Sequence, residues 1–166
     1  MDKTPRYNSG MRTLVGESAA EFRLPDTEGN LRQFREFHET GPVVLLFLPS
    51  VYGWRPRWQF WSLLRHYDRF VQLGVEIVVI STDSLPELRI YQIRKGFPFV
   101  FLSDRSGNVA TQYELQLWRA ETATMIVTSR GIIDYLHRTR FGRRSSARAL
   151  LRHLMKLDQQ ERLSGR

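Results

Sequence analysis

The fold is decided by six consecutive apolar residues, Val43-Val44-Leu45-Leu46-Phe47-Leu48, which Pro49 closes. Apolar residues at every position, with β-branched residues first, are typical of a central strand that is covered on both faces. A second buried strand is predicted for Val75–Ile80, after one intervening helical segment. Two such strands separated by a helix favour an α/β protein.

Turn and helix signals flank these runs on both sides. A hairpin is predicted around Asp26–Asn30, with Phe22, Leu24, Leu31 and Phe34 as its alternating apolar residues, and a helix is predicted from Trp58 to Leu73, where Gly74 ends it. Further predicted elements are a helix capped by Ser84, a strand at 99–102, a helix at 108–113, a hairpin of 123–127 and 132–136, and a helix after Ser145 or Ser146. This order predicts an α/β sandwich in which helices flank a mixed central sheet.

Length and composition favour one domain, since 166 residues with 42% hydrophobic content can bury an ordinary core. We expect a flexible arm at 1–13, the domain at 14–160 and a basic tail at 161–166. No apolar run approaches the roughly 20 residues of a membrane span, and the N-terminus lacks the apolar centre of a signal peptide, so a cytoplasmic protein is expected. Scattered histidines and the absence of cysteine predict no metal site, and no cofactor is expected.

The positive charge is concentrated near the C-terminus. Between Arg138 and Arg166 there are nine basic and two acidic residues, which supplies seven of the eight net positive charges. A helix predicted at 145–160 carries leucines on one face and Arg148, Arg152 and Lys156 on the other. Such a face indicates nucleic acid, an acidic protein or an anionic surface as partner, and the alternative is a solvated face that aids solubility.

Four stretches together resemble the peroxiredoxin family, the alkyl hydroperoxide reductase and thiol-specific antioxidant type of the thioredoxin-like fold. The stretches are Val15–Asp26, Ile77–Ser84, Phe97–Gly107 and Thr124–Gly131. They are similar to the family patterns V-G-x-x-A-P-x-F-x-L-x-D, V-x-x-I/V-S-x-D-S, F-P-x-x-x-L-S-D-x-x-G and T-F-V-I-D-x-x-G. The resemblance implies a thioredoxin-like sandwich with an N-terminal β-hairpin and a C-terminal helix that is basic here.

The resemblance also implies a peroxide-reducing thiolate at the start of the first long helix, in a P-x-x-x-T-x-x-C loop. Counted from Pro49, this loop places Gly53 at the threonine position and Pro56 at the cysteine position. In the alternative W-C-P-x-C registration, Arg55 and Trp58 take the two cysteine positions. Neither registration leaves a nucleophile.

The arginine that supports the thiolate in the family corresponds to Thr122. Arg119, three residues earlier, is the alternative source of a guanidinium for the pocket. Without the thiol and with this arginine displaced, the resemblance implies the fold and does not carry peroxidase activity.

The substituted loop, from Tyr52 to Trp61, holds three of the four tryptophans and two arginines. One interpretation is an anion site between Arg55 and Arg57 at the helix N-terminus, and a related one is a stacking and charged surface for RNA or protein. The alternative is that Trp58 and Trp61 fill the emptied pocket while the arginines face solvent. The residues expected to bind a partner are Trp54, Arg55, Arg57, Trp58, Arg143, Arg144, Arg148 and Arg152.

The leading hypothesis is a redox-inactive binding or structural subunit of a larger protein or nucleoprotein assembly, with RNA as a candidate partner. The alternative is an oxidoreductase of the same family that acts with a partner's thiol. A homodimer, or a heterodimer with an active paralogue, is a further candidate arrangement.

Overall fold

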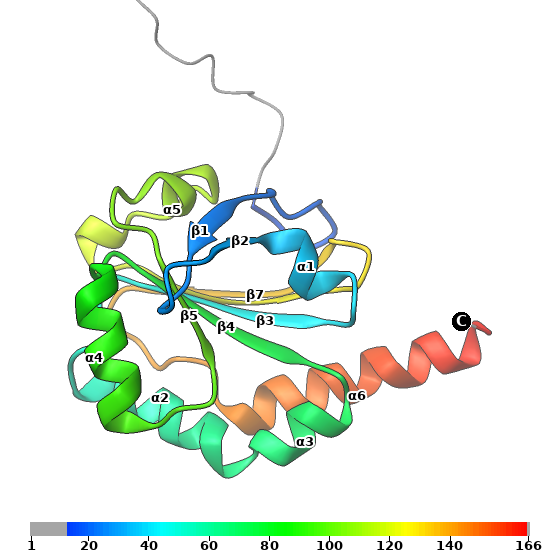
Figure 1. Cartoon of the computed structure of the whole chain (residues 1–166). Helices are drawn as coiled ribbons and strands as arrows, with labels where there is room; N and C mark the ends of the chain where they lie inside the picture. The colour runs from blue at the N-terminus through cyan, green and yellow to red at the C-terminus, as the bar shows by residue number, and fades with distance from the viewer. Residues whose placement is uncertain (1–12, 166) are drawn as a thin grey trace, which may run out of the picture.

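A five-stranded mixed sheet with helices on both faces forms the molecule (Figure 1). The computed structural model describes residues 13–165. The strand order is β5-β4-β3-β6-β7. The bounds are Val43–Leu48 for β3, Glu76–Ser81 for β4, Val100–Ser103 for β5, Thr122–Val127 for β6 and Ile133–Thr139 for β7. Strands β3, β4 and β5 run parallel, whereas β6 is antiparallel to both β3 and β7.

Strand β3 is the central strand, and all six of its residues are buried. Because successive side chains point to opposite faces, the strand contributes to two separate cores. Val43, Leu45 and Phe47 pack in one cluster, and Val44, Leu46 and Leu48 pack in the other. The predicted strand covered on both faces is therefore confirmed.

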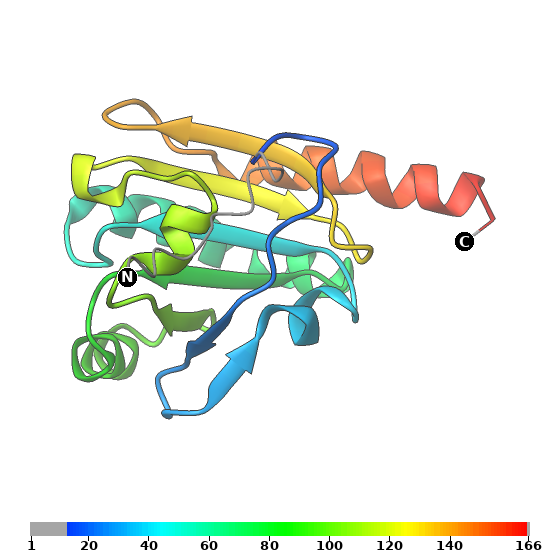
Figure 2. The ribbon, with the colours of Figure 1, turned by 90° about the horizontal axis from the view of Figure 1, so that it is seen from above.

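The first face of the sheet is covered by the N-terminal hairpin and two short helices (Figure 1). These elements are β1 at Arg23–Pro25, β2 at Leu31–Gln33, α1 at Phe34–His38 and α5 at Asn108–Gln112. Phe22 and Phe34 stack with ring centroids 4.9 Å apart, and Tyr113 closes the cluster against Phe47. Figure 2 looks onto this face and shows the N-terminal segment crossing the strands.

Four longer helices cover the second face: α2 at Trp54–Arg65, α3 at Tyr67–Gln72, α4 at Leu85–Lys95 and α6 at Ala147–Leu163. Phe60 lies at the centre of an aromatic cluster whose other members are Tyr91, Phe97, Phe99 and Phe101. Helix α6 buries the leucine stripe that the sequence predicted and exposes its basic face. Its last turns project beyond the sheet (Figures 1 and 2).

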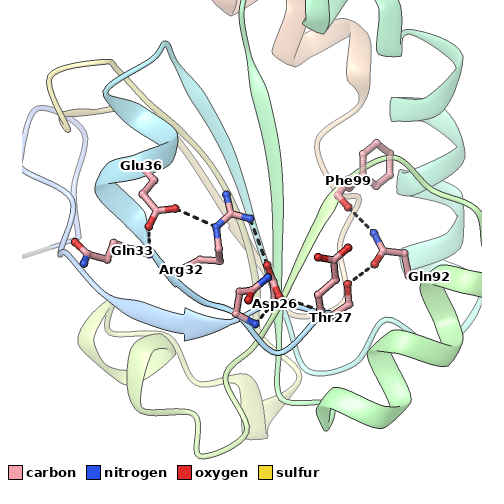
Figure 3. Close-up of polar contacts among 9 residues, drawn as sticks. Asp26, Thr27, Arg32, Gln33, Glu36, Gln92 and Phe99 are labelled. Atoms are coloured by element: carbon pink, nitrogen blue, oxygen red, sulfur yellow. Dashed lines mark hydrogen bonds and ion pairs between the residues drawn. The ribbon is translucent and has the colours of Figure 1, made fainter.

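Polar contacts tie the hairpin turn to the second layer of helices (Figure 3). The Asp26 carboxylate accepts hydrogen bonds from the backbone N–H groups of Glu28 and Asn30 and pairs with Arg32. On the other side of the turn, the Thr27 hydroxyl donates to the side chain of Gln92 on α4. Gln92 in turn donates to the carbonyl of Phe99 at 3.2 Å, so the turn, α4 and the start of β5 form one network.

Some element bounds differ from the sequence prediction. The helix predicted from Trp58 begins at Trp54 and is interrupted at His66, where α3 follows α2. Phe34, predicted to belong to the hairpin, begins α1, because Gln33 and Glu36 form a capping box there.

Other boundaries shift by a few residues at the two ends of the chain. Ser146, rather than Ser145, caps α6, and this helix continues to Leu163 into the predicted tail. The predicted flexible arm lies outside the described residues except for Thr13, which is buried. Residue 166 of the predicted tail also lies outside them.

The buried carboxylate of Asp83 fixes the loop that follows β3. It accepts hydrogen bonds from the Ser50 hydroxyl at 2.7 Å, the Val51 N–H at 2.8 Å and the Ser81 hydroxyl at 2.8 Å. Since Ser81 ends β4 and Ser50 follows β3, one side chain joins the carboxyl ends of two neighbouring strands. The position at which α2 begins is set by this contact.

Replacing Asp83→Ala is expected to lower the free energy of unfolding by about 1.5–3 kcal/mol, since a buried N–H and two hydroxyls lose a charged acceptor. Urea denaturation followed by tryptophan fluorescence measures the change. Glu28→Ala, at an exposed turn position, is the matched control and is expected to change stability by about 0.5 kcal/mol or less. Equal effects of the two substitutions would contradict the anchoring role of Asp83.

Candidate functional site

Gly53 and Pro56 shape the start of α2. Gly53 precedes the helix with φ +124° and ψ 169°, a region that is essentially restricted to glycine. A threonine, which the family pattern has at this position, could adopt that conformation only with strain. Pro56 is the third helical residue and is buried. Its missing N–H is tolerated there because the first four N–H groups of a helix have no partner within the helix.

The side of α2 that faces the sheet consists of Pro56, Gln59, Phe60 and Leu63. Gln59 is the polar member of this side. Its amide donates to the Thr124 hydroxyl and to the Ser145 carbonyl, both at 3.2 Å. The sequence did not predict this link between α2, β6 and the segment before α6, because the neighbours of Gln59 are the aromatic residues Trp58, Phe60 and Trp61.

The tryptophans of α2 lie on its outer side. Trp54, Trp58 and Trp61 are 64%, 72% and 51% exposed, so the interpretation that Trp58 and Trp61 fill the emptied pocket is wrong. The reason is helical phase: the helix begins at Trp54, and Pro56 and Phe60 occupy the inner face instead. Trp61 packs by its edge on Phe97, with ring centroids 5.8 Å apart.

Thr122, the residue predicted to take the place of the supporting arginine, makes an uncharged contact. Thr122 begins β6, is buried, and donates its hydroxyl to the Thr139 carbonyl on β7 at 3.2 Å. Arg119 does not replace the missing guanidinium, because it lies in a 3-10 helix at Leu117–Arg119 and stacks on Trp118, 4.4 Å from the ring centroid. Neither residue brings a positive charge to the start of α2.

A different arginine lies beside Thr122 and is already paired. Arg138 on β7 donates to the Glu121 carboxylate, with an Nη2 to Oε1 distance of 2.7 Å, and to the Glu114 carbonyl. Burial by itself raises the pKa of Glu121, but the hydrogen bonds from Arg138 and from the Gln116 N–H, with the charges of Arg138 and Arg140, lower this pKa below its usual value. This pair was not predicted, because the partners are 17 residues apart and meet only across the β6–β7 ladder.

A pocket of about 350 Å³ lies between the outer side of α2 and the segment that precedes α6. Its lining includes Trp54, Arg55, Trp58, Phe141, Arg143 and Arg144. Arg55 also stacks on Trp54, with its guanidinium carbon 5.2 Å from the ring centroid. Five of the eight residues expected to bind a partner therefore gather around one hollow.

The arginine pair of the predicted anion site is not brought together. Arg57 lines a second, separate hollow with Trp58, Trp61, Arg65 and Lys95. Arg55 instead faces the pocket that Arg144 lines. That Arg144 lies close to α2 could not be predicted from the sequence, because Arg144 follows Arg55 by almost ninety residues.

The basic face of α6 is separate from both hollows. Arg148 and Arg152 are exposed on α6 and line neither of them. Within residues 13–165, no group of three or more His, Asp or Glu side chains is placed to hold a metal ion. Every helix in this range is too short or too polar to cross a membrane.

Comparison with protein families gives one match over most of the chain. Residues 15–136 match the AhpC/TSA family. A selenocysteine-containing peroxiredoxin of Peptoclostridium acidaminophilum is 31% identical over 108 residues, which cover 60% of this chain and 53% of that protein. A peroxiredoxin of Aeropyrum pernix is 29% identical over 137 residues, covering 75% of this chain and 54% of that protein. The chain thus spans about half the length of these two relatives.

A solved structure shares the same arrangement of strands and helices. The crystal structure of peroxidoxin BcpB from Mycobacterium tuberculosis superposes with a TM-score of 0.78 at 22% identity, covering 89% of this chain and 98% of that one. At this identity the similarity concerns the fold alone. It confirms the α/β sandwich predicted from the sequence.

The lowered pKa of Glu121 predicts an acid-dependent loss of stability. A carboxylate with a lowered folded-state pKa stabilises the fold fully above its unfolded pKa, about 4.5, and loses this contribution as pH falls through the folded value. In Glu121→Gln this part of the pH dependence should disappear. Urea unfolding between about pH 7 and pH 3 measures it.

The exposed Glu17→Gln variant serves as the control and should keep the pH profile of the unmodified chain. A Glu121→Gln profile as steep as that of the unmodified chain would show that the Arg138 pair contributes nothing.

Proposed function

The chain belongs to the AhpC/TSA family, and on that premise we propose that it is a redox-inactive member that serves as a binding or structural subunit of a larger assembly. One observation carries the proposal: no cysteine occurs among the 166 residues, so neither Pro56 in the first registration of the family loop nor Arg55 and Trp58 in the second supplies a thiol. Thiol peroxidases act through a thiolate that attacks the peroxide oxygen. This chain has no atom that can form the corresponding sulfenic acid.

The surroundings of Pro56 support the same proposal. A hydroxyl bonded to a neighbouring strand replaces the supporting arginine at Thr122, and the guanidinium beside it, Arg138, is neutralised by Glu121. The Thr122 hydroxyl and the Arg138 guanidinium thus both make contacts across or beside the β6–β7 ladder. The side chains exposed at the start of α2 are tryptophans and arginines, which suit a contact surface.

Two surfaces are suited to hold a partner. The outer side of α2 exposes Trp54, Trp58 and Trp61 beside arginines, and tryptophan and arginine are the residue types most enriched where protein interfaces gain their binding energy. The exposed face of α6 presents Arg148 and Arg152, which favour an anionic partner such as RNA or an acidic protein. We propose a protein or nucleoprotein assembly as the partner on these grounds.

The purified chain, supplied with hydrogen peroxide and an excess of dithiothreitol or reduced thioredoxin, is expected to consume peroxide no faster than the same mixture without the chain. The measurement is peroxide loss over time at several protein concentrations. A rate that rises in proportion to the concentration of the chain would overturn the proposal and favour an oxidoreductase that borrows a thiol from its partner.

Charge reversal on α6 tests the second surface. The full chain carrying Arg148→Glu and Arg152→Glu is expected to leave the heavy fractions of a native extract and to sediment as a free protein. The substitutions should not weaken the helix, since Arg148 lies in its first turn, where an acidic residue is favourable, and glutamate and arginine have similar helix propensities. Sedimentation at about 50 and 500 mM salt, with and without ribonuclease, separates RNA from protein partners.

The matched control carries Arg89→Glu and Arg94→Glu on the exposed face of α4, which changes the charge equally on another helix. If both double variants sediment like the unmodified chain, the basic face of α6 makes no contact in the assembly.

A further inference from the structure

Arg144 is distinguished from the other arginines by a buried nitrogen that lacks a partner. Its Nη1 atom is buried and has no hydrogen-bond partner among the described residues. By contrast, Arg32 pairs with Asp26 and Glu36, and Arg138 pairs with Glu121. A buried donor on a charged group costs free energy when it makes no hydrogen bond, so such groups are normally paired.

The charge around Arg144 is uncompensated as well. Burial and then the nearby charge of Arg55 lower the pKa of Arg144 to about 10. Among the described residues that line the pocket, none is acidic, and Arg143 adds a third guanidinium. Two guanidinium groups that face one hollow without a carboxylate favour an anion between them.

The rest of the lining restricts the kind of anion. Trp54, Trp58 and Phe141 form apolar walls, and all three leave most of their surface exposed, with Phe141 at 74%. An inorganic phosphate would leave these rings in water and use only the charge. A ligand that carries an apolar body beside its anionic group would cover the rings and gain the burial of their surface.

A carboxylate matches the geometry of the charged end. The planar guanidinium of Arg144, which lines the pocket, can donate two parallel hydrogen bonds to a carboxylate. The hollow of about 350 Å³ has the size of a small-molecule site. It can hold a small acid or one terminal residue of a polypeptide.

We propose that the pocket between α2 and the segment 141–146 binds a carboxylate carried on an apolar body, with Arg144 and Arg55 holding the carboxylate and Trp54, Trp58 and Phe141 covering the body. A free organic acid and the C-terminal residue of a partner chain share this chemistry. The inference rests on the proposed binding role, since it assigns a ligand class to that surface. The two proposals can fail independently of each other. Peroxide turnover would contradict the redox-inactive binding role, whereas failure of the acids to bind would contradict the ligand class.

Nitrogen-edited NMR of the full chain tests the pocket directly, because the four tryptophans provide four indole N–H signals. Phenylacetate and the peptide acetyl-Ala-Ala-Phe are titrated as free acid and as C-terminal carboxylate, and their primary amides serve as uncharged controls. Both acids are expected to shift the Trp54 and Trp58 signals more than those of Trp61 and Trp118, which do not line the pocket. Whichever acid binds more tightly identifies the source.

Substitution then assigns the role of the arginine. Arg144→Met should weaken binding of either acid by about tenfold or more, as expected for loss of charge-assisted hydrogen bonds. Arg55→Met, at an exposed position that leaves the fold intact, should weaken it as well. Arg94→Met on α4 removes one charge elsewhere and should leave the affinity unchanged.

Three results would overturn the proposal: amides that bind as tightly as their acids, inorganic phosphate that competes as well as phenylacetate, or unaltered affinity in folded Arg144→Met and Arg55→Met variants. The dispersion of the backbone amide signals in the same spectra reports whether each variant is folded.

Discussion

Complete burial of β3 is the constraint on which the rest of the molecule depends. Its alternating side chains supply both hydrophobic cores, so a polar residue at any of the six positions would face an apolar cluster. The strand ends at Pro49, and Asp83 holds the following loop against the end of β4. The place where α2 begins is therefore set by the sheet and by one buried carboxylate. This explains how the loop itself can change its residues while the fold is kept.

Much of the fold could be predicted because short stretches of sequence indicate its strands, turns and helix ends. Uninterrupted apolar runs indicated the central strands, and Ser84 indicated the start of α4, where the structure has a capping box with Glu87. The phase of α2 could not be predicted, since its tryptophans suggested an inner face that Pro56 and Phe60 in fact occupy. A count of apolar residues cannot separate aromatic residues that pack inside from aromatic residues left outside.

The candidate site was predicted in part for a related reason. Spacing along the chain predicts Pro56, or Arg55 and Trp58, at the cysteine position and Thr122 at the arginine position, because these predictions rest on sequential patterns. The pocket depends on Arg144, which reaches α2 only after the chain has passed through β6 and β7. The contrast with Arg138 is informative, since that arginine has a carboxylate partner and completes the ladder. Arg138 and Arg144 thus carry the same charge only a few residues apart but make different contacts, and only the structure shows which of them has a carboxylate partner.

The conformation of Gly53 restricts which residue can precede α2. A backbone with φ +124° accepts glycine and strains any residue with a β-carbon, so a threonine at position 53 would require the first turn of α2 to move. Pro56 occupies that same turn, with its ring 3.7 Å from the place where a β-carbon of residue 53 would lie. That distance is an ordinary van der Waals contact, so the backbone conformation, and not the proline ring, restricts residue 53. A side chain with a β-carbon at position 53 would therefore need a different backbone path into α2, whatever residue stands at position 56.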